Sequence, residues 1–177
     1  MRGSSAPGRA GSILVTGFEP FAGWAMNSSW EAVRRLDGPD LVTARLTVDH
    51  GAAAAEIGAL IAAHRPRAVL MCGLAPVPVL RLETCARRGV LAVPGPSFRR
   101  GRWPWDASRR SATSRGLPVR FSHDAGSYVC DTTYWAALGS HVPAVAFLHL
   151  PPVGPSWSPA RLARAVAAVL SPFRGAG

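Results

Sequence analysis

Three short runs of apolar residues constrain the fold more than any other feature of the sequence. Residues 12–18, 68–74 and 142–150 are almost continuously apolar or small. Runs of this kind are typical of strands buried on both faces, as in a parallel sheet with helices on each side. Helical segments are expected between them, at 28–36 after an S-x-x-E capping box and at 52–64. We therefore predict an α/β protein, a single-domain three-layer α/β/α sandwich around a mostly parallel twisted sheet.

The remaining elements are weaker in the sequence. Residues 41–48 and 119–122 are expected to form further strands, and Ser158 followed by proline predicts a helix that ends near residue 170. Residues 75–116 show little periodicity apart from an alternation over 81–93. We expect a hairpin there, followed by a long loop.

Length and composition indicate one globular domain. The 177 residues suit a single core, which we place at 12–173 after a flexible N-terminal tail, 1–11. The tail lacks an apolar signal region and no run of about 18 apolar residues occurs, so we expect neither export nor a membrane anchor. Three cysteines without a C-x-x-C pair argue against a disulfide framework and a zinc site. We expect a cytoplasmic protein without a cofactor.

The charge of the chain is strongly positive. The formal net charge is +10, and all 20 basic residues are arginines. Arginines gather over residues 99–120 together with Trp103 and Trp105, a combination that could hold phosphates or bases. Arginine without lysine, in a chain rich in Ala, Gly and Pro, is however typical of a GC-rich genome, and no nucleic-acid-binding motif accompanies it. We expect no nucleic-acid partner.

A cysteine at a predicted strand-to-helix turn is the main candidate for a nucleophile. Cys130 precedes a helical segment that extends to about Leu138, and a thiol at a helix start meets free N–H groups that favour the thiolate. His149, near the end of the last apolar run, could serve as its base and acid. The spacing does not decide whether Glu83 or Asp124 would orient the imidazole. A buried cysteine and a core histidine without catalytic roles remain the alternatives.

Several blocks of sequence, in order along the chain, resemble the pyroglutamyl peptidase I family, also called pyrrolidone-carboxylate peptidases. They are L-V-T-G-F-E-P-F-A-G at 14–23, N-S-S-W-E-A-V-R-R-L at 27–36, C-G-L-A at 72–75, the segment around Glu83, H-D-A-G-S-Y-V-C at 123–130 and F-L-H-L-P at 147–151. The resemblance implies a cysteine peptidase that removes an N-terminal pyroglutamyl residue. Its partner would be an N-terminally pyroglutamylated peptide or a similar small amide, and homo-oligomers are expected.

The same resemblance implies the roles of individual residues. Cys130 would be the nucleophile, His149 the general base and acid, and Glu83 the carboxylate that orients the histidine. The substrate-binding set would be two aromatic walls around the lactam ring, a polar residue and two backbone positions: Phe18, Phe21, Asn27, Leu74 and Val129. N–H groups at the helix start near Cys130 would receive the oxyanion.

Three departures from the family pattern keep other functions open. Val93 stands where the family has an arginine, for which Arg87 or Arg88 could substitute. Asp131 follows the cysteine in place of asparagine and would raise the thiol pKa. A helix that family members insert between the positions of Gly116 and Phe121 is expected to be missing. A divergent relative acting on another small amide or lactam metabolite, or a catalytically degenerate binding or structural protein, are therefore the alternatives to the peptidase.

Overall fold

The computed structural model describes residues 11–88 and 97–174 and is built around one six-stranded sheet. The strand order is β2-β1-β3-β8-β4-β7. Neighbouring strands are parallel except for β4 and β8, which run antiparallel. The bounds of the strands are β1 Ile13–Phe18, β2 Leu41–Leu46, β3 Ala68–Leu74, β4 Leu80–Glu83, β7 Val119–Ser122 and β8 Ala144–Leu150.

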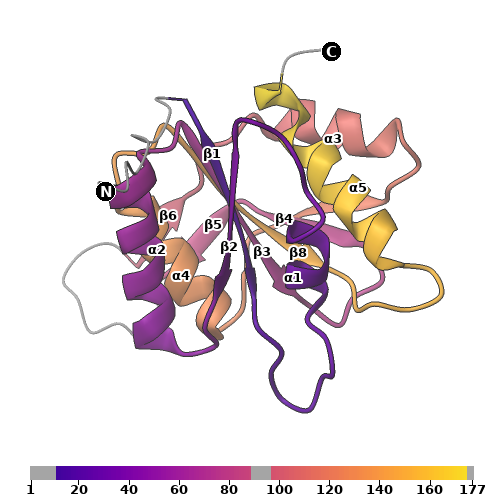
Figure 1. The fold of residues 1–177 in the computed structure, drawn as a ribbon, viewed down its shortest axis with the longest axis horizontal. Coiled ribbons are helices and arrows are strands. Elements are labelled where there is room, and N and C mark those ends of the chain that lie inside the picture. The colour runs from indigo at the N-terminus through magenta and orange to yellow at the C-terminus, as the bar shows by residue number, and fades with distance from the viewer. Residues whose placement is uncertain (1–10, 89–96, 175–177) are drawn as a thin grey trace, which may run out of the picture.

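Helices cover both faces of this sheet (Figure 1). One side carries α2 and α4, and the other side carries α1, α3 and α5. The helices are α1 Ser28–Val33, α2 His50–His64, α3 Trp105–Thr113, α4 Val129–Leu138 and α5 Pro159–Leu170, with a 3-10 turn at Ser171–Phe173. The prediction of a three-layer α/β/α sandwich is confirmed.

The central strands explain why the apolar runs were informative. Every residue of β1, β3 and β8 is buried, because successive side chains point alternately into the two helical layers. Leu70 of β3 belongs to the layer of α1, α3 and α5, whereas Met71 belongs to the layer of α2 and α4. Burial on both faces demands apolar residues at consecutive positions, which is the pattern the sequence shows.

The two predicted helix starts have different outcomes. Ser158 caps α5 as expected, because its hydroxyl accepts a hydrogen bond from the backbone N–H of Arg161. The capping box predicted for α1 is wrong: the cap is Asn27, whose Oδ1 accepts from Ser29 N. Glu31 instead pairs with the arginines at 34 and 35, and α1 ends at Val33 rather than at residue 36.

The segment between β3 and β7 is more ordered than the sequence indicated. β5 (Cys85–Arg87) and β6 (Phe98–Arg100) form a small antiparallel sheet of their own, and α3 follows where a long loop was expected. The arginine-rich segment 99–115 therefore includes a helix that packs against α5, and the ring of Trp103 packs at a tilt against that of Phe173.

The expected loss of a family helix between Gly116 and Phe121 stays a prediction; α3 ends just before this segment and covers the sheet. Val93 and the end of the predicted hairpin lie outside the described residues, as do residues 1–10 of the predicted tail.

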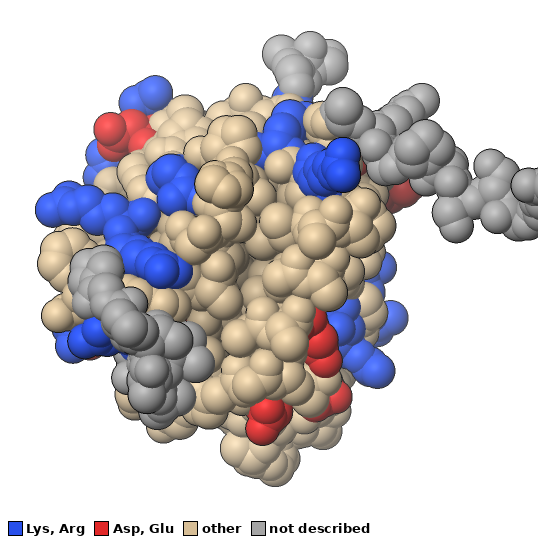
Figure 2. All heavy atoms as spheres, turned by 90° about the vertical axis from the view of Figure 1, so that its left-hand side faces the viewer, with Lys and Arg blue, Asp and Glu red and all other residues tan. Residues whose placement is uncertain are grey.

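The face that α2 and α4 present has an uncharged centre. In Figure 2 the arginines lie toward the upper, left and right margins of this face, and several carboxylates lie at its lower right. The exposed positions of α2 contribute to the uncharged area, since they are glycine and alanine at 51, 55, 58, 59, 62 and 63. Within the described part of the chain, no helix combines the length and apolar character needed to cross a bilayer.

Replacing Gly17 by alanine is expected to destabilise the protein. A Cβ at this position of β1 would lie 2.7 Å from the backbone of Ser29 and Trp30, and backbone can yield only if α1 moves. We expect a loss of about 1 to 3 kcal/mol in the free energy of unfolding, measured by urea denaturation.

Gly58→Ala is the matched control for that substitution. Gly58 is an exposed position inside α2 with open space around it, so alanine there should add about 0.5 to 1 kcal/mol through helix propensity. Equal stability of Gly17→Ala and the unaltered protein would contradict the close packing of α1 on β1.

Candidate active site

A pocket of about 500 Å³ opens at the carboxyl ends of the central strands. Its walls come from the loop after β1, the end of β3, the start of α4 and the end of β8. The lining residues are Phe18, Phe21, Ala22, Trp24, Asn27, Val48, His50, Leu74, Ala75, Pro76, Arg81, Ala125, Gly126, Tyr128, Val129, Cys130 and His149. Every site residue predicted from the sequence except Glu83 is among them.

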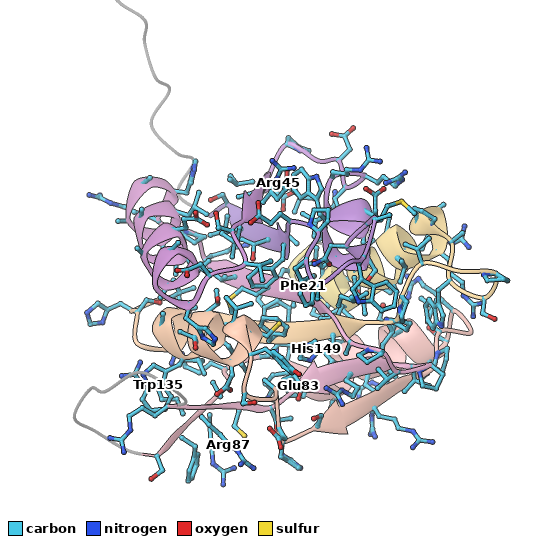
Figure 3. All side chains as sticks on the ribbon, turned by 90° about the horizontal axis from the view of Figure 1, so that it is seen from below. Phe21, Arg45, Glu83, Arg87, Trp135 and His149 are labelled. Carbon is cyan, nitrogen blue, oxygen red and sulfur yellow. The ribbon has the colours of Figure 1, made fainter. Side chains whose placement is uncertain are left out.

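Glu83 lies directly behind the pocket, where it is bonded to His149. Nδ1 of His149 lies 2.7 Å from Oε1 of Glu83, and both side chains are almost completely buried. Figure 3 shows the two residues side by side on neighbouring strands, with Phe21 on the opposite side of His149. Since an ionised carboxylate can only accept, Nδ1 carries the proton and Nε2 is left free on the pocket side. Asp124, the other candidate acceptor, is exposed and pairs loosely with Arg87 at 3.7 Å.

Cys130 reaches the same place from the helical layer. It is the second residue of α4, and a Cβ added to Gly73 of β3 would lie 2.9 Å from its Sγ. Gly73 is paired in register with His149 on β8, so the thiol lies above the strand that neighbours the histidine. In the described part of the chain no hydrogen bond joins Sγ to the imidazole. Catalytic hydrogen bonds are often long before substrate binds.

Burial and the neighbouring Asp131 hold the thiol of Cys130 in its neutral form. Burial raises the pKa of Cys130 to about 12, and the favourable contact with its own backbone N–H is too small to offset this effect. Glu83 and Asp131 act in the same direction as burial through their negative charge. The start of α4 thus favours the thiolate as expected, but desolvation has the larger effect.

The first turn of α4 leaves two backbone donors available. Tyr128 caps the helix without a side-chain hydrogen bond, and Asp131 N already donates to Tyr128 O. The N–H groups of Val129 and Cys130 precede the first intrahelical hydrogen bond and have no backbone acceptor among the described residues. They lie next to the thiol, where an anionic oxygen would form during attack on a carbonyl.

Asp131, the residue that follows Cys130, has a carboxyl group that is only partly hydrogen-bonded. Its Oδ1 accepts from the backbone N–H of Arg87 at 2.8 Å, whereas its Oδ2 is buried without a hydrogen-bond partner in the described chain. Burial raises the pKa of this carboxyl to about 6. Asp131 thus links the start of α4 to the β5–β6 hairpin. When it is ionised, its buried charge lowers the free energy of unfolding.

The residues expected to hold the substrate all border the pocket. Phe18 is almost completely buried at the end of β1, while Phe21 is half-buried in the loop that follows. Asn27 is buried and also shapes this loop, because it donates from Nδ2 to Glu19 O and caps α1 with Oδ1. Leu74 and Val129 approach from β3 and α4.

Four further polar or aromatic side chains that line the pocket were not predicted: Trp24, His50, Arg81 and Tyr128. Periodicity could not have found them, because three come from loops or helix starts and one from the antiparallel strand β4. Arg87, proposed as a substitute for the family arginine, lies outside this pocket, on the far side of Glu83 from Phe21 (Figure 3). Across residues 11–88 and 97–174 no group of three or more His, Cys, Asp or Glu side chains is placed to hold a metal ion.

Asp131→Asn is expected to change how stability depends on pH. The folded protein holds the Asp131 proton up to about pH 6, whereas the carboxyl has an ordinary value of 3.8. The unfolded chain therefore binds fewer protons between about pH 4 and pH 6, and stability falls as pH rises through that window. Asparagine can still accept from Arg87 N, so the variant should match the unaltered protein near pH 4 and exceed it by up to about 2 kcal/mol at pH 7.

Chemical denaturation at a series of pH values measures this difference. Asp124→Asn is the control, because Asp124 is exposed and its removal should leave the pH profile nearly unchanged. A constant difference between Asp131→Asn and the unaltered protein from pH 4 to pH 7 would contradict the raised pKa.

Comparisons with known proteins agree on one family. The sequence model of pyroglutamyl peptidase matches residues 11–84. Pyroglutamyl-peptidase 1 of Rattus norvegicus is 30% identical over 93% of this chain and 90% of its own length, and the pyrrolidone-carboxylate peptidase of Chromobacterium violaceum is 33% identical over 79% and 77%.

Solved structures show the same relationship. The pyrrolidone carboxyl peptidase of Thermus thermophilus superposes with a TM-score of 0.78 at 33% identity, over 89% of this chain and 98% of that one. The pyroglutamyl peptidase I of Bacillus amyloliquefaciens shares the fold, with a TM-score of 0.82 at 23% identity over 90% and 92%. Since the sequence matches extend over most of the chain and the fold agrees, this chain belongs to the pyroglutamyl peptidase family.

Proposed function

We propose that this protein is a cysteine peptidase that hydrolyses the amide bond after an N-terminal pyroglutamyl residue. The observation that carries the proposal is the buried hydrogen bond between His149 and Glu83, at the edge of a pocket that also contains the thiol of Cys130. A neutral imidazole with one nitrogen bonded to a carboxylate and the other free is the arrangement that a thiol nucleophile requires. The membership of the family supports the same chemistry.

The reaction would begin from a neutral thiol. His149 Nε2 takes the Cys130 proton as Sγ attacks the pyroglutamyl carbonyl carbon, so the thiolate forms together with the new C–S bond. The carbonyl oxygen becomes an oxyanion near the N–H group of Cys130 at the start of α4. Glu83 stabilises the imidazolium that results from this proton transfer.

The second half of the reaction returns each group to its starting state. The imidazolium donates its proton to the leaving nitrogen as the C–N bond breaks, which leaves a thioester on Cys130. A water molecule then attacks the thioester with His149 as base. Pyroglutamate is released, and the proton returns to the cysteine.

The lining of the pocket suits a small lactam ring. Phe18 and Phe21 provide apolar walls on the β1 side, and the backbone near Leu74 and Val129 offers hydrogen-bonding groups for the lactam amide. The buried Asn27 holds the loop that carries Phe21 through its bond to Glu19 O. An apolar pocket with few oriented polar groups is typical of small-molecule recognition.

We also propose a reducing cytoplasmic setting. Cys72, Cys85 and Cys130 are all free thiols in the structure, and the mechanism requires that Cys130 stays reduced. The expectation of self-association stays a prediction, to be measured by light scattering.

Cys130→Ala is expected to abolish the release of the chromophore from a chromogenic pyroglutamyl amide under reducing conditions. The variant lacks the only sulfur among the described residues that line the pocket. The rate of chromophore release should therefore fall to that of the uncatalysed reaction in buffer. Cys85→Ala is the matched control, because Cys85 is half-buried on the β5 strand outside this pocket and should retain activity. Equal rates for Cys130→Ala and the unaltered protein would contradict the proposal.

Glu83→Gln is expected to lower kcat by about 10² to 10⁴ with a small effect on KM. The amide can present the wrong group to His149 Nδ1 and cannot stabilise an imidazolium. The steady-state kinetics of Asp124→Asn provide the comparison, since Asp124 is exposed and pairs with Arg87 rather than with His149. If Asp124→Asn caused the larger loss in kcat, the assignment of Glu83 as the orienting carboxylate would be wrong.

A further inference from the structure

Arg81 occupies a position in the pocket that no predicted role accounts for. It lies in β4 directly opposite His149 in the antiparallel β4–β8 pair. It stands two positions before Glu83 along the strand, so both side chains point to the same face of the sheet. Its neighbour in register on β7 is a second arginine, Arg120.

The guanidinium of Arg81 is only partly satisfied by the protein. Its Nε lies 3.2 Å from Glu83 Oε1, the same oxygen that His149 contacts. This Nε is buried without a hydrogen bond of good geometry, and within the described residues the two terminal amino groups have no acceptor. The side chain is 30% exposed and lines the pocket. It therefore has donors available for a ligand.

The charge of the pocket indicates which kind of ligand these free donors would bind. No aspartate or glutamate is among the described residues that line it, so Arg81 carries its one permanent charge. Arg120 on the adjacent edge strand is exposed and also lacks a partner in the described chain. Two cations side by side, with one carboxylate already shared with His149, favour the approach of an anion.

The strand order places Arg81 on the leaving-group side of the reaction. Along the sheet, β1 with Phe18 lies two strands from β8 on one side of His149, and β4 with Arg81 lies on the other side. If the lactam ring rests between the phenylalanines, the leaving nitrogen faces His149, which protonates it. The first atoms beyond that nitrogen then extend toward Arg81.

We propose that Arg81 selects leaving groups that carry a carboxylate close to the scissile bond. The carboxylate would be the α-carboxylate of a pyroglutamyl dipeptide or the side chain of an acidic residue that follows pyroglutamate. A guanidinium binds either through paired N–H donors. The inference rests on the proposed peptidase function and specifies the substrate class of the same site.

Two substrates that differ only in this charge test the inference. The specificity constants kcat/KM are measured for pyroglutamyl-alanine and pyroglutamyl-alaninamide. A second pair, the α-amides of pyroglutamyl-aspartic acid and pyroglutamyl-asparagine, places the charge on the side chain instead. The ratio of acid to amide in each pair is compared between the unaltered protein and Arg81→Gln. The intrinsic reactivity of each substrate is the same for every variant, so a change in the ratio reports the contact with the carboxylate.

We expect the ratio of acid to amide to fall about tenfold in Arg81→Gln, mainly through KM for the acid. Arg81→Lys should recover part of it, and Arg87→Gln, an exposed arginine outside the pocket, should leave it unchanged. If the preference for the α-amide of pyroglutamyl-aspartic acid over that of pyroglutamyl-asparagine also falls in Arg81→Gln, Arg81 binds a side-chain carboxylate as well as an α-carboxylate. A purely structural effect on Glu83 and His149 would lower all substrates equally, and that result would overturn the inference.

Binding to Cys130→Ala separates this inference from the peptidase function. Calorimetry should show tighter binding of pyroglutamyl-alanine than of its amide to Cys130→Ala, and no such difference for Cys130→Ala combined with Arg81→Gln. Turnover of both substrates with an unchanged ratio would leave the peptidase function intact and exclude the role of Arg81. Absence of Cys130-dependent turnover would instead contradict the proposed function.

Discussion

The buried hydrogen bond between His149 and Glu83 sets the requirements that the rest of the site must meet. A carboxylate with no exposure is costly unless its charge is compensated. Here Glu83 Oε1 accepts from His149 Nδ1 and forms an ion pair with the guanidinium of Arg81 at 3.2 Å, while Tyr134 donates to the backbone oxygen of Glu83. These contacts hold the carboxylate in place, and the carboxylate in turn holds the imidazole with Nε2 toward the pocket.

The topology of the sheet brings this pair to a place where a substrate can reach it. Chain order reverses between β1 and β3, because β2 lies on one side of β1 and β3 on the other. Ligands in open α/β sheets bind at such switch points, outside the carboxyl ends of the strands. Phe18 and Leu74 end the two strands that flank this point. Gly73 leaves space above β3 for the thiol that α4 supplies, so the sheet and a helical layer each contribute part of the site.

How far sequence reasoning reached depends on whether a feature is set locally or by distant contacts. Strands buried on both faces must be apolar, so 12–18, 68–74 and 142–150 could be located within about two residues of their observed bounds. The antiparallel pairing of β4 with β8 and the helix α3 depend on contacts distant in sequence, such as Ser108 with the backbone of Val169. The cap of α1 was missed because Asn27 competes with Ser28 in a way that only the loop geometry decides. In the candidate site, the motifs predicted Cys130, His149 and Glu83, which lie together in the structure. Spacing could not distinguish Glu83 from Asp124, since only the β4–β8 pairing brings one of them to the imidazole. Arg81 was missed for the same reason. Asp131 was expected to raise the pKa of Cys130, but the larger effect of burial was not foreseen, because the degree of burial is not visible in a sequence.

The proposed function depends on the joint placement of thiol, imidazole and lactam pocket. The most direct test is to map the residue alkylated by pyroglutamyl chloromethyl ketone, using peptide mass spectrometry, with free pyroglutamate as competitor. We expect one equivalent of label on Cys130, slowed by pyroglutamate, while Cys72 and Cys85 stay unmodified. Labelling of Cys85 in preference to Cys130, or labelling of Cys130 at a rate that pyroglutamate does not affect, would contradict this placement.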